Sequence, residues 1–139
     1  MKLFFILFVA LFAVTSGCQT REQIMQEREG DKLAGSLEAA AYMAEVENVR
    51  RLISEKAAVN TTFTDGGTPL FSAIERIPAE RNKRRLIERR REVIKVLLEA
   101  GANPNVEKNG KRLIETAKEG GDAEINRMLE EAAAGRKPV

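Results

Sequence analysis

The spacing of hydrophobic residues divides the chain into an apolar run, a polar stretch and a series of helices. Residues 3–14 are twelve consecutive apolar side chains, whereas residues 19–35 contain few. From residue 37 onwards, leucine, isoleucine, valine and alanine recur at intervals of three and four residues, which is typical of helices that bury one face. The pattern therefore predicts an all-α domain over residues 36–134, with residues 135–139 as a short tail.

Two helix ends in the middle of the chain can be placed from residue chemistry. Thr68 is a suitable N-cap, because its hydroxyl can accept a hydrogen bond from a backbone N–H of the first turn. Pro69 fits the first helical position, where no N–H is needed. Gly101 follows the periodic run that contains Leu97 and Leu98, where a left-handed cap favours glycine. We therefore predict that one helix begins at Pro69 and that another ends just before Gly101.

The same stretch resembles an ankyrin repeat. Its start, DGGTPLFSAI, and its end, VIKVLLEAGANPN, are similar to the T-P-L-H-x-A-A and V-x-x-L-L-x-x-G-A-x-x-N signatures of that family. The matching residues are Thr68, Pro69, Leu70, Ala73, Ile94, Leu97, Leu98, Gly101, Ala102 and Asn105. The resemblance implies a solenoid of helix-turn-helix repeats that are joined by short finger turns.

One helix pair cannot bury its own apolar face, so a solenoid needs neighbouring repeats. An upstream match carries Leu37, Ala40, Ala41, Val49, Leu52, Ile53, Ala57, Val59 and Asn60, with Lys56 in place of the glycine. A weaker downstream match carries Gly110, Ile114, Ala117, Gly121, Ile125, Met128 and Leu129, and resembles a C-terminal cap. We therefore predict three repeats, over residues 37–60, 65–105 and 110–132.

The second repeat is enlarged by about 12 residues, since 27 residues separate Leu70 from Leu97 and only 15 separate Leu37 from Leu52. Pro78 is expected to end the first helix near Ile77, and the second helix is expected to begin near Asn82. The insertion is rich in basic residues, namely Arg81, Lys83, Arg84, Arg85, Arg89, Arg90 and Arg91.

Two interpretations of this basic patch are open. The first is a solvated helix face, in which Glu88 pairs with Arg84 or Arg85, and Glu92 with Arg89, at helical spacing. The second is a docking surface for an acidic partner or for anionic lipid head groups. Nucleic acid is not expected as a partner, because no aromatic residues interleave the charges.

The first residues predict export. Residues 1–17 have the form of a secretory signal peptide, and residues 3–14 are too short to be an ordinary membrane span. Gly17 and Cys18 resemble the bacterial lipobox, which implies that Cys18 is lipidated. Gln19 after the cysteine implies the outer membrane, with the domain in the periplasm. The alternative is a cleaved signal beside an incidental cysteine. Residues 18–35 are predicted to be a flexible tether, with a short helix near residues 21–28 as an equal possibility.

No catalytic residues, metal site or cofactor site are predicted. The chain has no histidine, which removes the usual general base and the commonest metal ligand. The spacing of a glycine-rich phosphate loop is absent as well. Without residues 1–17 the chain has 22 basic and 21 acidic side chains. A net charge of +1 creates no strong electrostatic field around the protein. We expect a monomer.

The resemblance implies that fingers and first helices form one concave face that binds a partner protein. Carried over position by position, the partner-binding residues are Tyr42, Met43, Phe63, Thr64, Asp65, Gly67, Glu75, Arg76, Lys108, Asn109, Lys111 and Glu119. Tyr42 is the preferred anchor, and packing against the tether is its alternative. The family's finger-bracing histidine is replaced by Glu38, Phe71 and Glu115 in the three repeats, which implies looser fingers.

The sequence thus predicts a non-enzymatic protein-protein interaction module that is anchored to the bacterial cell envelope. Small exported ankyrin proteins of this kind resemble immunity proteins that inhibit a toxin or lipase effector acting in the periplasm. Others resemble envelope scaffolds or stress-protection proteins, and the arginine-rich helix would then contact anionic lipid or an acidic partner. The fold itself barely restricts this choice.

Overall fold

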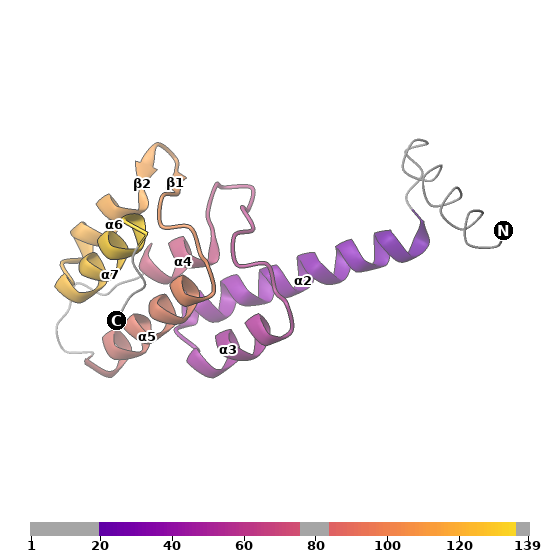
Figure 1. Cartoon of the computed structure of the whole chain (residues 1–139), viewed down its shortest axis with the longest axis horizontal. Helices are drawn as coiled ribbons and strands as arrows, with labels where there is room; N and C mark the ends of the chain where they lie inside the picture. Colours follow the sequence, from indigo (N-terminus) through magenta and orange to yellow (C-terminus); the bar gives the residue numbers. More distant parts are fainter. Residues whose placement is uncertain (1–19, 76–83, 136–139) are drawn as a thin grey trace.

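The computed structural model describes residues 20–75 and 84–135, and Figure 1 traces the elements that they form. The helices are α2 (Arg21–Met43), α3 (Val46–Ser54), α4 (Pro69–Glu75), α5 (Arg84–Glu99), α6 (Leu113–Gly120) and α7 (Ala123–Ala133), and the two short strands are β1 (Glu107–Lys108) and β2 (Lys111–Arg112). The predicted all-α solenoid is therefore confirmed. Four predicted functional residues, Cys18, Arg76, Arg81 and Lys83, lie outside the described residues.

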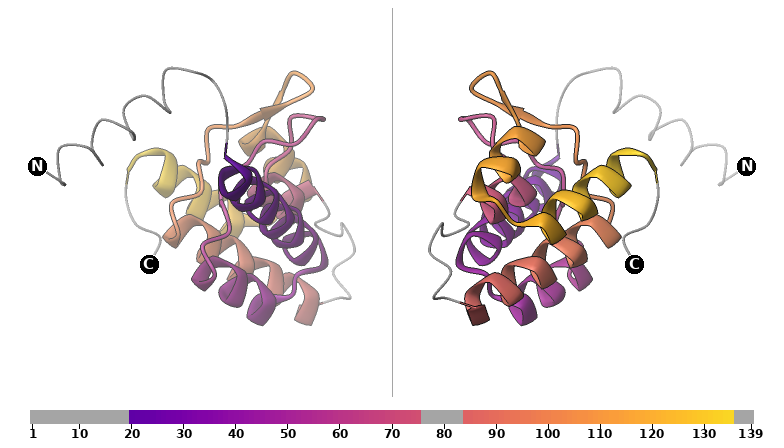
Figure 2. Two further views of the ribbon diagram at one scale, coloured as in Figure 1. Left: turned by 90° about the vertical axis from the view of Figure 1, so that its right-hand side faces the viewer. Right: turned by 90° about the vertical axis from the view of Figure 1, so that its left-hand side faces the viewer.

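The helices pair in sequence order and stack in two layers. Contacts join α2 to α3, α4 to α5, and α6 to α7, which gives three helix pairs. Contacts between pairs join α2 to α4 and α4 to α6 in an inner layer, and α3 to α5 and α5 to α7 in an outer layer. Figure 2 shows the stack from both sides. The predicted sequence of three repeats corresponds to these three pairs.

Equivalent residues of the three repeats fill the core. Ala40, Ala73 and Ala117 occupy matching positions in α2, α4 and α6, and each is buried. Ile94 of α5 and Ile125 of α7 close the core from the outer layer and are also fully buried. Because each repeat buries its apolar stripe against the next, the periodic pattern of the sequence becomes one continuous core.

The predicted helix ends are present. The Thr68 hydroxyl accepts a hydrogen bond from the Phe71 N–H at 3.2 Å, and α4 begins at Pro69. After α5, Gly101 adopts a φ of +91° and its N–H donates to the Leu98 carbonyl at 3.0 Å. Lys56, which replaces the repeat glycine after α3, adopts the same left-handed conformation with a φ of +69°. A lysine therefore stands where the backbone favours glycine.

The expected flexible tether is instead the first half of a 23-residue helix. The Thr20 hydroxyl and the Gln23 side chain cap each other's backbone N–H groups, so α2 begins at Arg21. Residues 20–32 are all exposed, and this arm projects from the body of the domain (Figure 1). The alternative of a short helix near residues 21–28 is thus closer to the structure, although the helix continues without a break into the first repeat.

Helix α5 carries the described part of the insertion. It has 16 residues, compared with nine in α3 and 11 in α7. Arg84 lies 3.6 Å from Glu88, as the helical spacing predicted. Glu92 pairs with Arg50 of α3 rather than with Arg89, because α3 packs beside α5. The expected ends near Ile77 and Asn82 fall outside the described residues.

One side chain joins the loops of neighbouring repeats. The Asn60 amide nitrogen donates to the Gly101 carbonyl at 2.9 Å, and its oxygen accepts from the Asn103 N–H at 2.7 Å. Both bonds span about forty residues of sequence, so they fix the loop after α3 against the loop after α5. This contact gives a physical reason for an asparagine at the end of the repeat pattern.

Candidate protein-binding face

The finger before α4 is a tight turn held by its own backbone. The Phe63 N–H donates to the Gly67 carbonyl and the Gly66 N–H donates to the Phe63 carbonyl, each at 2.9 Å. The Asp65 carboxylate accepts from the Gly67 N–H at 2.9 Å. Position 66 favours glycine, because a residue with a side chain would be strained at its φ of +83°. Thr64 and Asp65 are consequently exposed near the tip.

The finger before α6 is a short β-hairpin. Glu107 pairs with Arg112, and Lys108 pairs with Lys111, in antiparallel register. The two residues between them, Asn109 and Gly110, have φ values of +52° and +76°. An Asn-Gly pair with two positive φ angles is the preferred connection for a two-residue hairpin.

Lys108 connects the two fingers and helix α4. Its ammonium lies 2.8 Å from the Asp65 carboxylate, 3.0 Å from the Glu75 carboxylate, and 5.6 Å from the centre of the Phe71 ring. Only 14% of its side chain is exposed. The hydrogen bond between them lowers the pKa of Asp65 and raises that of Lys108. Three of the predicted partner-binding residues are therefore held together before any partner arrives.

Other charged residues of this face are also paired within the chain. Lys111 forms an ion pair with Glu119 of α6. Glu115, which stands where the family has a histidine, accepts hydrogen bonds from the Arg112 backbone and side chain. Glu38, at the matching position of α2, accepts a hydrogen bond from the Ser72 hydroxyl at 3.1 Å. These contacts brace the inner layer through residues that the repeat pattern does not specify.

The exposed apolar side chains of the face come from the first repeat. Tyr42 and Met43, at the end of α2, are 37% and 60% exposed. Phe63 of the finger is half-buried, and Phe71 is buried beneath Lys108. The face thus offers apolar side chains at its first repeat and preformed ion pairs at its second and third. Tyr42, Asp65, Glu75 and Lys108 were predicted for this face, whereas the ion pairs that join Lys108 to Asp65 and Glu75 were not.

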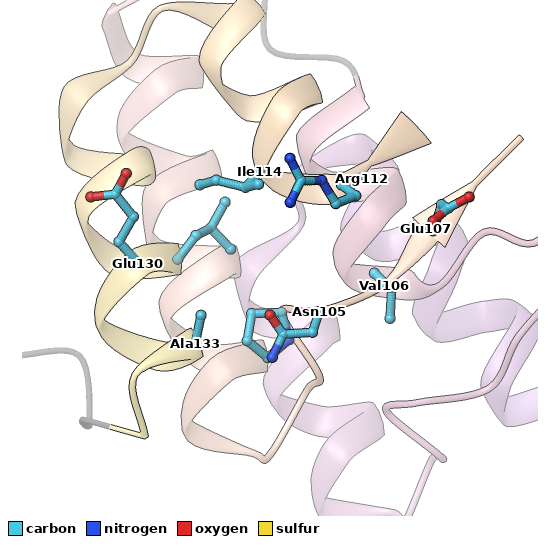
Figure 3. Close-up of a pocket in the computed structure, with 9 residues that line it drawn as sticks. Asn105, Val106, Glu107, Arg112, Ile114, Glu130 and Ala133 are labelled. Carbon is cyan, nitrogen blue, oxygen red and sulfur yellow. The ribbon is translucent and has the colours of Figure 1, made fainter. Parts of the chain in front are cut away.

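A pocket lies in the third repeat. It has a volume of about 210 Å³ and is lined by Pro104, Asn105, Val106, Glu107, Arg112, Ile114, Leu129, Glu130 and Ala133. Figure 3 shows Glu107 and Arg112 on the side of the finger, and Glu130 and Ala133 on the side of α7. Drug-sized ligands occupy pockets of about 300 Å³ or more. This one is smaller, and no motif in the sequence predicted it.

The predicted basic patch does not form one surface. Arg90 is only 2% exposed, and its guanidinium donates to the Ala73 carbonyl at 2.8 Å and to the Tyr42 carbonyl at 2.9 Å. Its position was detectable in the sequence, because it lies four residues before Ile94 and seven before Leu97, on the apolar face of the helix.

Arg91 is also held within the fold, at 2.9 Å from the Asp122 carboxylate. Burial acts to raise the pKa of Asp122, but Arg91 and the backbone N–H groups at the start of α7 hold it below its usual value. Since Arg84 pairs with Glu88, Arg85 and Arg89 are the exposed arginines of α5 that make no ion pair within the described part of the chain.

No group of histidine, cysteine or carboxylate side chains within residues 20–75 and 84–135 has the arrangement of a metal site. Over the same ranges, every helix is too short or too polar to cross a membrane.

Stacked helix pairs with projecting fingers and a face built from the inner helices define an ankyrin-repeat solenoid, which is in general a protein-binding fold. A solved ankyrin repeat domain from Acinetobacter baumannii is similar to this chain, with 32% sequence identity and a TM-score of 0.61. The match covers 69% of this chain and 46% of the Acinetobacter domain, so this chain spans about half of the length of that domain. The likeness supports membership of the ankyrin-repeat family. No family model matches the chain, and no curated protein does.

Proposed function

We propose that the chain binds a partner protein through the face formed by Tyr42, Met43, the two fingers and the exposed ends of α4 and α6. The observation that carries this proposal is the combination of exposed apolar side chains in the first repeat with ion pairs that are already formed around Lys108. Preformed pairs reduce the ordering cost of association, and an exposed tyrosine is a common anchor at interfaces.

The test is capture of partners from cell-envelope extract by the chain and by two variants. Tyr42→Ala combined with Glu75→Ala and Lys111→Ala removes contacts of the face. Glu47→Ala combined with Arg127→Ala removes exposed charges from the outer helices α3 and α7, and serves as the matched control. A protein retained by the chain and the control, and lost with the first variant, supports the face. Equal retention by all three would contradict it.

More specifically, we propose that the chain is a lipid-anchored immunity protein that inhibits a toxin or lipase effector in the periplasm. The support is the lipobox-like Gly17 and Cys18 and the absence of a histidine from the sequence, which fits an inhibitor better than an enzyme. Cys18→Ala should abolish incorporation of a labelled fatty acid and release the protein from the membrane fraction. A captured partner should have a hydrolytic activity that the chain inhibits. An unlabelled wild-type protein would refute the anchor, and a partner without such activity would refute the inhibitory role.

A second candidate function is contact of α5 with anionic lipid, in an envelope scaffold or stress-protection protein. It is favoured by the exposure of Arg85 and Arg89 without ion pairs among the described residues. Arg85→Glu with Arg89→Glu should abolish sedimentation with phosphatidylglycerol vesicles, whereas the triple variant at Tyr42, Glu75 and Lys111 should sediment normally. Arg90 and Arg91 are left unchanged, because both hold the fold together. Unchanged sedimentation of the first variant would exclude this function.

A further inference from the structure

The chain leaves each outer helix in the same local conformation. Lys56 after α3, Gly101 after α5 and Gly135 after α7 are all left-handed, with φ values of +69°, +91° and +73°. Each of the three donates its N–H to the carbonyl three residues earlier, at 3.0 Å, which is a common way to end a helix. The loop after α7 therefore begins as the two earlier loops do.

The sequence after α7 also repeats the sequence after α5. Residues 101–104 read Gly-Ala-Asn-Pro, and residues 135–138 read Gly-Arg-Lys-Pro. The residue in the fourth place is apolar and half-buried in both earlier loops, as Val59 after α3 and as Pro104 after α5. Pro138 stands in the fourth place after α7, so the pattern predicts that it too is covered by an apolar contact.

The pocket of the third repeat lies where the chain leaves α7. Ala133, the last residue of this helix, lines the pocket (Figure 3), and its apolar wall includes Ile114 and Leu129. Gly135 follows only two residues later. The three residues from Gly135 to Pro138 can span up to roughly 10 Å, which is enough to place the proline against a pocket that begins at the preceding helical turn.

Asn105 is suited to hold the backbone of this segment. Asn60, at the matching place of the loop after α3, binds the first carbonyl and the third N–H of the loop after α5. Asn105 lines the pocket, and within residues 20–75 and 84–135 its backbone N–H is bonded, to the Asn103 side chain, whereas its own side-chain amide is not. The corresponding groups of the loop after α7 are the Gly135 carbonyl and the Lys137 N–H.

The charges around the pocket fit a basic segment. The lining carries two carboxylates, Glu107 and Glu130, and one guanidinium, that of Arg112. Arg112 is paired with a carboxylate of α6, and Glu130 lies 3.5 Å from a lysine of the same helix, whereas Glu107 forms no ion pair in the described part of the chain. Residues 136 and 137 are an arginine and a lysine. They would bring positive charge to a rim whose net charge is negative.

We propose that residues 136–139, which lie outside the described residues, fold back over the third repeat, so that Pro138 fills the pocket and Asn105 binds the backbone. The tail then closes the end of the solenoid, and the pocket is the seat of this segment rather than a site for a small ligand or a partner. The proposal is independent of the partner-binding face, because neither Asn105 nor Pro138 belongs to that face.

Nuclear magnetic resonance of the whole chain tests the contact. We expect nuclear Overhauser effects between Pro138 and the methyl groups of Ile114 and Leu129, and a shift of those methyl resonances when residues 136–139 are deleted. Absence of these effects, or methyl resonances that the deletion leaves unchanged, would overturn the proposal. Effects found only between differently labelled copies in a mixed sample would also overturn it, because the pocket would then hold the tail of a second copy.

Hydrogen exchange tests the role of Asn105. The Lys137 N–H should exchange roughly ten times more slowly than in an unstructured peptide, as expected for one hydrogen bond, and Asn105→Ala should remove this protection. Asn48→Ala, at an exposed asparagine of α3, is the matched control and should leave the rate unchanged. An unprotected Lys137 N–H in the parent contradicts the proposal. Equal loss of protection at the Asn103 N–H in Asn105→Ala also contradicts it, because the effect would then be a general loosening of the loops.

Discussion

Replacement of Arg90 by methionine should destabilise the domain far more than the same change at Arg89. The Arg90 guanidinium joins three helices, because it extends from α5 to carbonyl groups near the ends of α4 and α2. Each charge-assisted bond contributes about 1.5 to 3 kcal/mol, and its loss leaves a carbonyl without that donor. Methionine fills much of the volume and removes the cost of burying a charge, which offsets part of the loss. The expected net decrease in the free energy of unfolding is roughly 2 to 4 kcal/mol.

This decrease is large for a small domain, whose total stability is commonly about 5 to 15 kcal/mol. Urea denaturation followed by far-ultraviolet circular dichroism measures it directly. Arg89→Met is the matched control, since Arg89 is exposed on the same helix and its replacement should change stability by less than about 0.5 kcal/mol. If the two variants unfold at the same urea concentration, Arg90 does not fix the helix ends as the hydrogen bonds indicate.

Three further predictions follow from single contacts. Lys56→Gly should raise stability by roughly 1 kcal/mol, because a φ of +69° strains lysine and suits glycine; a lower thermal midpoint would refute this. Asn60→Ala should lower stability by roughly 1 to 2 kcal/mol through loss of its two inter-loop hydrogen bonds. It should also speed hydrogen exchange at the Asn103 N–H. Unchanged exchange would show that the bonds are not maintained.

The third concerns pH. The pKa of Asp122 in the folded state is below the ordinary value of 3.8, so its stabilising contribution is complete above that value and is lost as the pH falls through the folded-state pKa. Asp122→Asn should therefore be less stable than the parent at neutral pH and show a smaller decline in acid. Identical pH profiles in urea denaturation would show that the pair with Arg91 has no energetic effect.

The basic residues of α5 show where reasoning from composition failed. A run rich in arginine indicates a charged surface, but it does not show which of its members point inwards. The positions of Arg90 and Arg91 depended on neighbours that are distant in sequence, namely the carbonyl groups of Tyr42 and Ala73 and the carboxylate of Asp122. The helical period places Arg90 beside Ile94 on the apolar face of α5, which distinguishes it from the exposed arginines Arg85 and Arg89.

The candidate protein-binding face was also predictable only in part. Its residues could be assigned by matching positions to the repeat, because the repeat fixes which turn and which helix carry each position. The ion pairs that join Lys108 to Asp65 and Glu75 could not be predicted, since they link different repeats and depend on the spacing between stacked fingers. The pocket between the third finger and α7 was missed for the same reason.

Local chemistry was sufficient for the helix ends and the repeat boundaries. Thr68, Pro69 and Gly101 each act on backbone within a few residues, and the apolar positions of each repeat recur with the helical period, so the sequence alone predicted the helices. The resemblance to the ankyrin repeat implied their arrangement as a solenoid. The hydrogen-bond partners of Arg90 and the pairing of Lys108 were decided by the tertiary structure. Each depends on which side chains and helix ends the stacking of repeats brings together, and that proximity has no local signature in the chain.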